Sequence, residues 1–158
     1  MHNLISGKSA VLITRQLKHT SMPGINKAIA RRIIQDIFID GNILHLEELV
    51  SANVIVHDTD QELYGLSQFR HDIITLRTAF PDLHYIIHDL LADKDKVILR
   101  CTATCTHLGP FRGIAATGKA MSYSVILIWR FSGARLCEHW SVSDMDRMLQ
   151  QPGKVQPK

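Results

Sequence analysis

The sequence predicts one α+β domain, in which helices pack on one face of a curved, mainly antiparallel sheet. Two observations carry this prediction: segments with helical periodicity come first, over 25–39 and 65–80, and strand-like segments follow over 84–143. Helices followed by a meander of strands are typical of α+β folds. The 158 residues suit a single domain, since compact domains usually have about 100 to 150 residues.

The helices are predicted from the spacing of apolar residues. In 25–39 isoleucine recurs every four positions, which places these side chains on one face, and Asp40-Gly41 supplies a stop. A short second helix is expected over 44–50, where leucine recurs. The helix over 65–80 ends before Pro81, because a residue that precedes proline avoids the helical conformation.

The strands are predicted from segments rich in Ile, Val, Thr and Tyr. A short one over 53–58 precedes the helix over 65–80. Four more follow over 84–91, 96–107, 121–131 and 135–143. Ser132-Gly133 is a suitable hairpin turn between the last two segments.

The segment 121–131 is apolar on both faces. Tyr123 and Trp129 share one face, while Ile126 and Ile128 lie on the other. A strand that is apolar on both faces is usually covered on both. The domain's own helices would cover one face, so we expect a second copy of the chain to cover the other and give a homodimer.

The composition excludes several classes of protein. With 46% hydrophobic and 21% charged residues and a net charge of +3, it suits a soluble globule. No apolar run approaches the roughly 20 residues that span a bilayer, and no basic cluster with interleaved aromatic residues points to nucleic acid. Cys101 and Cys105 fall about 13 Å apart on one predicted strand, too far for a disulfide. With Cys137, these mostly interior thiols favour a cytoplasmic protein.

The two ends of the sequence are expected to lie outside the domain. Residues 1–22 show no clear period, and we expect an N-terminal extension that is partly disordered. The domain itself is expected over 23–150, with a flexible tail over 151–158.

Two motif-like patterns are rejected on their context. Gly113 to Lys119 matches the spacing of a phosphate loop, but Ala120 stands where Ser or Thr should hold magnesium, and a strand follows instead of a helix. His84 and His88 could share a metal only on a helix, and they fall on a predicted strand, about 13 Å apart. We therefore expect neither a metal nor a cofactor.

The last predicted strand carries the first candidate site. Alternation places Glu138, Trp140, Val142 and Asp144 on one face, and Trp and Val there suggest that this face is buried. One interpretation is structural: Glu138 pairs with an arginine and Asp144 caps a following helical turn. The other is chemical, because a carboxylate in an apolar cavity holds its proton more tightly and can exchange it near neutral pH.

Two histidines at strand ends are further candidates. His107 ends the segment 96–107 and opens a Gly/Pro-rich loop, and His57 with Asp58 ends the first strand. Each is either a surface or turn histidine or, if it faces inward, a group that orients a substrate oxygen.

Several motifs together resemble one protein family. They are Ala79-Phe-Pro-Asp-Leu83, Asp95 to His107, Gly109 to Gly118, Arg130-Phe131, and Glu138-His-Trp140 with Asp144. Their order and spacing over about residues 23–150 resemble the SnoaL-like polyketide cyclases, which have a nuclear transport factor 2-like (cystatin-like) fold. The resemblance implies a cone-shaped sheet whose helices enclose a pocket, and usually a homodimer.

The resemblance also implies a site. In the characterised cyclases an aspartate acts as acid and base for an aldol ring closure, without metal or cofactor. The matching residue here is Asp144; His107 matches a histidine near the substrate, and Trp140 and Arg100 match recurrent structural or pocket positions. Ser141 stands where many relatives have Asp.

Three functions are carried forward. The first is a cofactor-independent cyclase or isomerase of a polyketide-like carbonyl compound, with Asp144 as acid/base, His107 on the enolate, and Trp140, His57, Glu138 and Arg100 around the substrate. The second is a non-catalytic protein that binds a small hydrophobic ligand, or a hydroxylase-type member of the same family. The third is an interaction module that uses the outer sheet face.

Overall fold

The computed structural model describes residues 22–57 and 62–150. The expected extension over 1–22, apart from Met22, and the expected tail over 151–158 lie outside the described residues. The elements are α2 (Met22–Arg32), η1 (Ile33–Ile39), η2 (Ile43–His45), α3 (Leu46–Leu49), β1 (Val50–His57), β2 (Glu62–Tyr64), α4 (Leu66–Ala79), β3 (His84–Asp93), β4 (Lys96–Thr106), β5 (Ala120–Ser132), β6 (Arg135–Ser143) and α5 (Met145–Gln150).

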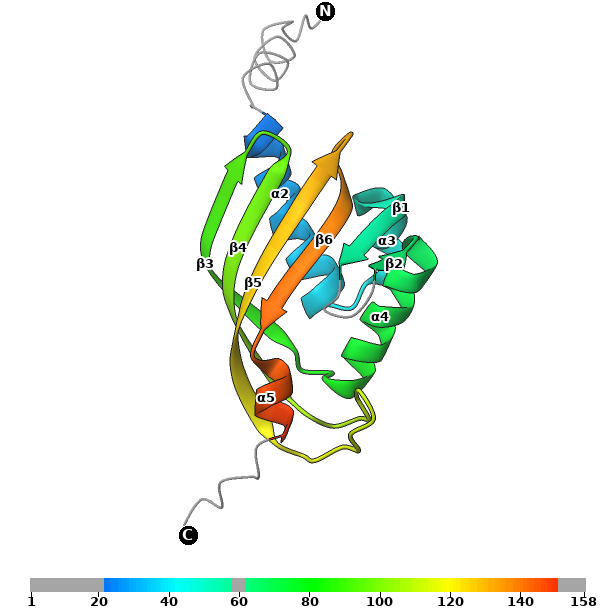
Figure 1. Cartoon of the computed structure of the whole chain (residues 1–158), viewed down its shortest axis with the longest axis vertical. Coiled ribbons are helices and arrows are strands. Elements are labelled where there is room, and N and C mark those ends of the chain that lie inside the picture. The colour runs from blue at the N-terminus through cyan, green and yellow to red at the C-terminus, as the bar shows by residue number, and fades with distance from the viewer. Residues whose placement is uncertain (1–21, 58–61, 151–158) are drawn as a thin grey trace, which may run out of the picture.

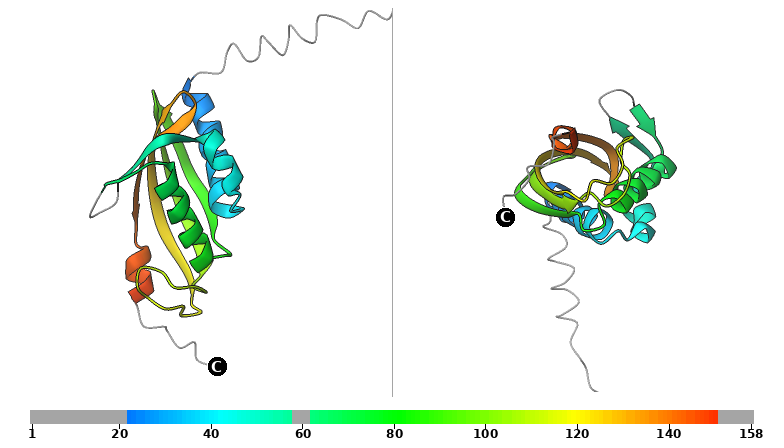
Figure 2. Two further views of the ribbon diagram at one scale, coloured as in Figure 1. Left: turned by 90° about the vertical axis from the view of Figure 1, so that its right-hand side faces the viewer. Right: turned by 90° about the horizontal axis from the view of Figure 1, so that it is seen from below.

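The strands form one curved sheet in the order β2-β1-β6-β5-β4-β3. All neighbours are antiparallel except β1 and β6, which run parallel. Figure 1 shows α2 behind this sheet and α4 beside it on the right, and the end-on view of Figure 2 shows the sheet curling around its concave face, with the helices closing the open side. The predicted α+β fold with a cone-like sheet is confirmed.

The first helical segment is longer and less regular than its isoleucine spacing suggests. It starts as the α-helix α2 and continues as the π-helix η1, where Asp40 N–H donates to Gln35 O at 2.8 Å. Ile33 and Ile37 are fully buried against the sheet, as the spacing predicts. Gly41 then reverses the chain with φ +68°, a left-handed conformation that favours glycine at a helix end.

The core lies between the helices and the concave face of the sheet. Alternate residues of β4 and β5 point into it, among them Leu99, Leu127 and the fully buried Trp129. From the helices come Phe69 and Ile73 of α4. No helix in the described part of the chain is both long enough and apolar enough to cross a membrane.

The opposite, convex side of the sheet is called the outer face here. It carries exposed apolar side chains from four strands: Ile86, Leu91, Ile98, Ile126, Ile128 and Val142. The predicted two-sided apolar character of 121–131 is therefore present, with one face in the core and the other at the surface.

A bulge in β6 changes which of its side chains point inward. Phe131 pairs with Leu136 but Arg130 pairs with Glu138, so Cys137 is an extra residue. Beyond it, His139 is buried and Ser141 and Ser143 line a cavity on the concave side, whereas Val142 is 71% exposed. The prediction that Glu138, Trp140, Val142 and Asp144 form a buried wall is wrong. Glu138, Trp140 and Val142 do share one face, as alternation predicts, but it is the outer face of the sheet, and Asp144 is exposed after the strand.

Candidate functional site

A cavity of about 150 Å³, called the inner cavity here, lies on the concave side of the sheet. Strands β3, β5 and β6 supply one wall, and η1 and α4 supply another. The loop 107–119 and the start of α5 supply the rest. Its lining residues are Phe38, Leu76, Tyr85, Phe111, Arg112, Tyr123, Val125, Leu127, His139, Ser141, Ser143 and Met145. The wall is therefore mainly apolar and aromatic, with a polar strip along β6.

Two tyrosines flank Ala103 across the concave face, because Tyr85 and Tyr123 both pair with that residue. Burial raises the pKa of each phenol well above its usual range, so both stay protonated at neutral pH. The Tyr123 hydroxyl is buried and makes no hydrogen bond in the described structure. Burial is the main cause of the raised pKa of Tyr123, and the nearby Tyr85 hydroxyl adds to it. The two hydroxyls nevertheless form no hydrogen bond in the described structure.

His139 is held in one orientation by Trp129. The indole Nε1–H donates to His139 Nδ1 at 2.8 Å, and the two rings lie 6.0 Å apart. Since an indole nitrogen can only donate, Nδ1 must accept, and the neutral imidazole carries its proton on Nε2. His139 is thus set up as a hydrogen-bond donor, with its basic nitrogen already occupied.

No carboxylate lines the inner cavity among the residues that the structure describes. Its one charged lining residue is Arg112, whose Nη1 donates to Asp146 Oδ2 at 2.6 Å. This ion pair, called the clasp here, joins the loop 107–119 to α5. Phe111 and Met145, the neighbours of the two clasp residues, form part of the cavity wall.

Asp144 lies at the surface, and the prediction that it faces a closed cavity is wrong. It follows the last residue of β6, and its Oδ1 accepts a hydrogen bond from Ser124 N at 2.9 Å. Its carbonyl accepts from Met148 N at 3.1 Å, the first bond of the helical turn that α5 continues. The predicted cap on a following helical turn is met only by this backbone carbonyl, because the carboxylate binds an amide of β5 and not an N–H of α5. Ser124 follows the lining residue Tyr123, so the carboxylate lies beside the strand that forms this part of the cavity wall.

His107 faces inward, which decides between the two interpretations of its position. The side chain is fully buried, stacks on Phe80 at 5.3 Å, and places Nδ1 3.0 Å from Thr117 Oγ1. Its Nε2 is buried without a partner in the described structure. The ring does not line the inner cavity but lies behind Phe80, which contacts the lining residue Phe111.

Three predicted substrate-binding residues gather elsewhere, on the outer face where β1 meets β6. His57 stacks on Trp140 at 4.3 Å with nearly parallel rings, and its Nε2 lies 3.2 Å from Glu138 Oε2. The other ring nitrogen lies 3.1 Å from Glu62, and Glu138 also pairs with Arg130. Both imidazole nitrogens are occupied, so this group joins the strands and leaves no free polar atom of His57 for a ligand. Glu138 pairs with an arginine, as the structural interpretation predicted.

Arg100 also points away from the inner cavity. It lies on the outer face, where its Nε donates to Asp89 Oδ2 at 2.5 Å. The unbroken pairing of β4 explains this, because Arg100 and His107 have opposite parity and only His107 can face inward. The predicted pocket role of Arg100 is therefore not supported by its position.

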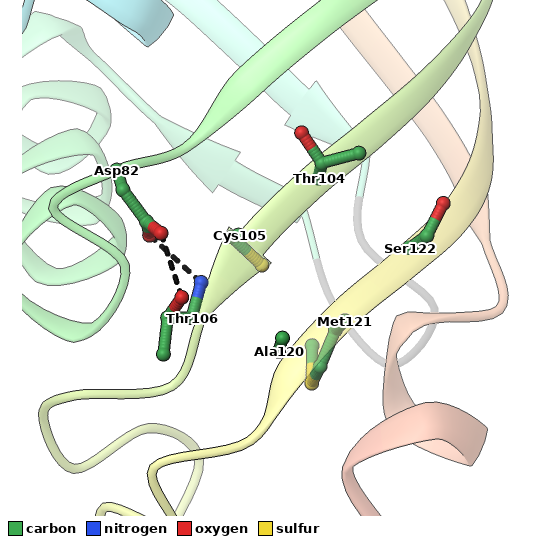
Figure 3. A pocket seen from close by; sticks show the side chains of 7 residues that line it. All are labelled: Asp82, Thr104, Cys105, Thr106, Ala120, Met121 and Ser122. Atoms are coloured by element: carbon green, nitrogen blue, oxygen red, sulfur yellow. Dashed lines mark hydrogen bonds between the residues drawn. The ribbon is translucent and has the colours of Figure 1, made fainter.

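A second recess, of about 400 Å³, lies at the ends of β4 and β5 (Figure 3). Asp82 occupies its rim and accepts hydrogen bonds from Thr106 N and Oγ1, both at 2.7 Å. These bonds lower the pKa of Asp82, with the Thr106 hydroxyl as the largest cause. Both carboxylate oxygens hold the end of β4 in place, so we assign Asp82 a structural role.

The sequence reasoning did not single out Tyr123, His139 and Ser143 as site residues. Tyr123 was placed on the correct face of its strand, and Ser141 was noted only as a departure from the family pattern. His139 and Ser143 could be found only with the pairing of β5 and β6, since the bulge at Cys137 decides their direction.

Comparison with known proteins gives the chain a family. The model of the SnoaL-like polyketide cyclase family matches residues 28–152. A proposed SnoaL-like polyketide cyclase of Jannaschia sp. CCS1 has a TM-score of 0.78 at 16% identity, covering 85% of this chain and 98% of its own. AclR of Streptomyces galilaeus, a proposed hydroxylase, has a TM-score of 0.71 at 25% identity, with coverages of 82% and 99%.

A third structure has a higher sequence identity to this chain than the two above. A proposed polyketide cyclase of Acidithiobacillus ferrooxidans has a TM-score of 0.70 at 29% identity, covering 82% of this chain and 95% of its own. No curated protein matches the chain. The family match covers most of the sequence and the fold agrees with it, so this chain belongs to the SnoaL-like polyketide cyclase family.

Proposed function

We propose that this chain binds a small, mostly apolar molecule in the inner cavity and holds it without acid/base catalysis by a carboxylate. The observation that carries the proposal is the lining of the cavity: aromatic and aliphatic walls, polar groups on β5 and β6, and no Asp or Glu among the described lining residues. Ligand sites in proteins commonly combine an apolar wall with a few placed polar groups.

The position of Ser141 supports binding rather than proton abstraction. Ser141 lines the inner cavity, at a position where the family resemblance leads us to expect Asp. A serine hydroxyl donates and accepts hydrogen bonds but is a weak base. His139 does not replace the missing carboxylate, because Trp129 occupies its basic nitrogen.

The test is a binding screen with a matched pair of variants. Small neutral aromatic and carbonyl compounds of several sizes are titrated against the isotope-labelled full chain, and backbone amide shifts are followed by NMR. We expect shifts concentrated around Tyr123, His139 and Ser141. Ser141→Phe should remove them by filling the cavity, while Val142→Phe, one residue away on the outer face, should keep them. Shifts that survive Ser141→Phe unchanged would place the binding site elsewhere.

A cofactor-independent cyclase or isomerase is the second candidate, favoured by one observation. The Asp144 carboxylate accepts a hydrogen bond from Ser124 N, next to the lining residue Tyr123, so a carboxylate lies close to the strand that forms this part of the cavity wall. In this version Tyr123 would hydrogen-bond the substrate oxygen, and Asp144 would take the proton from carbon when the ligand reaches the rim of the cavity. His107, behind Phe80, would support the loop that closes over it.

The two candidates are separated by proton exchange. A bound ligand with an acidic C–H next to a carbonyl is incubated with the chain in D2O, and incorporation of deuterium is measured. The catalytic candidate requires exchange well above the buffer rate and its loss in Asp144→Asn. Binding without exchange supports the first proposal.

A further inference from the structure

We infer that the inner cavity takes a neutral single six-membered ring that carries one hydroxyl or carbonyl oxygen, and that it excludes fused-ring compounds. The inference rests on the proposed function and adds the size and the chemistry of the ligand. It also departs from the polyketide-like substrate that the family resemblance implies, since polyketide cyclases build larger ring systems.

The volume sets the size limit. The inner cavity holds about 150 Å³, whereas sites for drug-sized ligands are about 300 to 1,000 Å³. An apolar cavity of about 150 Å³ is large enough for benzene. One six-membered ring with a small substituent therefore fills this space, and a fused second ring would have to extend past Ser141 and Ser143, which are exposed at its mouth.

The aromatic walls resist enlargement because each ring is fixed by another. Phe38 packs edge-on to Tyr85 at 5.7 Å and stacks on Trp129 at 6.2 Å. Phe111 packs against Phe80 at 5.1 Å, and Phe80 in turn stacks on His107. In an interior packed in this way, the rotation of one side chain does not enlarge the cavity enough to admit a second ring.

The buried Tyr123 hydroxyl calls for an oxygen on that ring. It lies in the wall of the cavity, stays protonated because burial raises its pKa, and has no hydrogen-bond partner in the described structure. A protonated phenol can donate to a ligand hydroxyl or carbonyl oxygen. A ring without oxygen would leave this hydroxyl unsatisfied, as it is in the free protein.

The charges around the cavity favour a neutral ligand. Arg112 is its one charged lining residue among those described, and the clasp already pairs it with Asp146. No carboxylate is present among the described lining residues to balance a cationic ligand. An ion of either sign would enter an apolar site without a free partner, which is unfavourable.

The test compares three probes: phenol, benzene and 2-naphthol, titrated against the full chain by NMR. We expect phenol to bind with amide shifts around Tyr123 and Ser141, benzene to bind more weakly, and 2-naphthol to bind more weakly than about 1 mM. Ser141→Phe should abolish phenol binding, with Val142→Phe as the matched control.

Tyr123→Phe tests the hydrogen bond separately. It should raise the dissociation constant of phenol about fivefold, the usual effect of one neutral hydrogen bond, and leave that of benzene nearly unchanged. An equal change for both probes would show that Tyr123 acts only through packing and would overturn its assigned role.

The outcomes separate this inference from the proposed function. If 2-naphthol binds as tightly as phenol and Ser141→Phe blocks it, the size limit is wrong while binding in the cavity stands. If none of the probes binds and larger compounds also fail, both are wrong. If phenol binds and Ser141→Phe does not affect it, the cavity is not the site.

Discussion

At the scale of single residues, the Tyr123 hydroxyl is one of three buried side-chain polar atoms without a hydrogen-bond partner in the described structure, with Asn26 Oδ1 and His107 Nε2. It has no hydrogen bond in the described structure, although it is surrounded by the core of β5. A buried polar atom without a partner costs about 1 to 3 kcal/mol. Such an atom persists in a stable protein when something other than the free fold requires it, which is the reason to connect Tyr123 with a ligand.

Tyr123→Phe is therefore expected to stabilise the free protein. Removing the hydroxyl leaves the ring in place and eliminates the unsatisfied group, so the free energy of unfolding should rise by about 1 kcal/mol. Urea denaturation followed by far-UV circular dichroism measures it. Tyr85→Phe, made at the neighbouring phenol, is the control. A lower stability for Tyr123→Phe would mean that its hydroxyl is already satisfied, by water or by Tyr85.

Replacing Asp144 is expected to destabilise the free protein. Its Oδ1 accepts from Ser124 N, so Asp144→Ala should lower the free energy of unfolding by about 1 kcal/mol, the usual effect of losing one hydrogen bond, while the backbone carbonyl at the start of α5 is unchanged. Asp144→Asn keeps an acceptor oxygen and should cost less. Equal losses for the two variants would show that the carboxylate charge, and not the hydrogen bond, matters at this position.

At the scale of elements, strand faces were predictable where pairing is regular. In β5 the alternation of Tyr123, Val125, Leu127 and Trp129 gave the correct inner face, and the boundaries of β3 to β6 lie close to the predicted ones. The site prediction failed in β6, because Trp140 and Val142 lie on the outer face although their apolar side chains suggest a core. The extra residue Cys137 shifts the inward-facing positions from Leu136 to His139. A bulge is a property of two paired strands and leaves no periodic signal in either alone. The three-residue β2 and the π-helical turns of η1 are likewise too short or too irregular for a pattern.

The clasp is expected to control local opening more than global stability. Arg112 and Asp146 are 49% and 56% exposed, and pairs of this kind contribute at most about 1 kcal/mol. Arg112→Ala should leave the unfolding midpoint nearly unchanged but speed amide hydrogen exchange in 109–118 and in α5. Arg100→Ala removes a comparable exposed pair on the outer face and serves as control. Unaltered exchange in Arg112→Ala would show that Phe111 and Met145 alone keep the loop closed.

At the scale of the whole molecule, the outer face is the surface that the fold leaves uncovered. Exposed isoleucines, a leucine and a valine from four strands share it, beside the stacked His57 and Trp140. Contiguous apolar surface on a sheet usually marks an interface. A second copy of the chain remains the partner that we propose for it, in line with the sequence prediction of a homodimer.

A charge placed on the outer face should therefore separate the subunits. Ile126 is 44% exposed, and Ile126→Glu should shift the sedimentation coefficient from that of a dimer to that of a monomer at micromolar concentration. Leu44→Glu, at a residue in η2 that is 84% exposed, is the matched control and should have no effect. A wild-type chain that already sediments as a monomer would disprove the dimer.

The parallel pairing of β1 with β6 fixes the order in which the molecule can be completed. Strands β3 to β6 pair with their neighbours in sequence. In contrast, Ile55 of β1 pairs with Glu138 of β6, near the end of the described chain. Contacts so distant in sequence are costly to form early and slow the search for the native state. During synthesis, the first helices and β1 must leave the ribosome long before their partner exists. We expect pulsed hydrogen exchange during refolding to protect β4 and β5 first and β1 last, so that β6 remains an uncovered sheet edge until the final step.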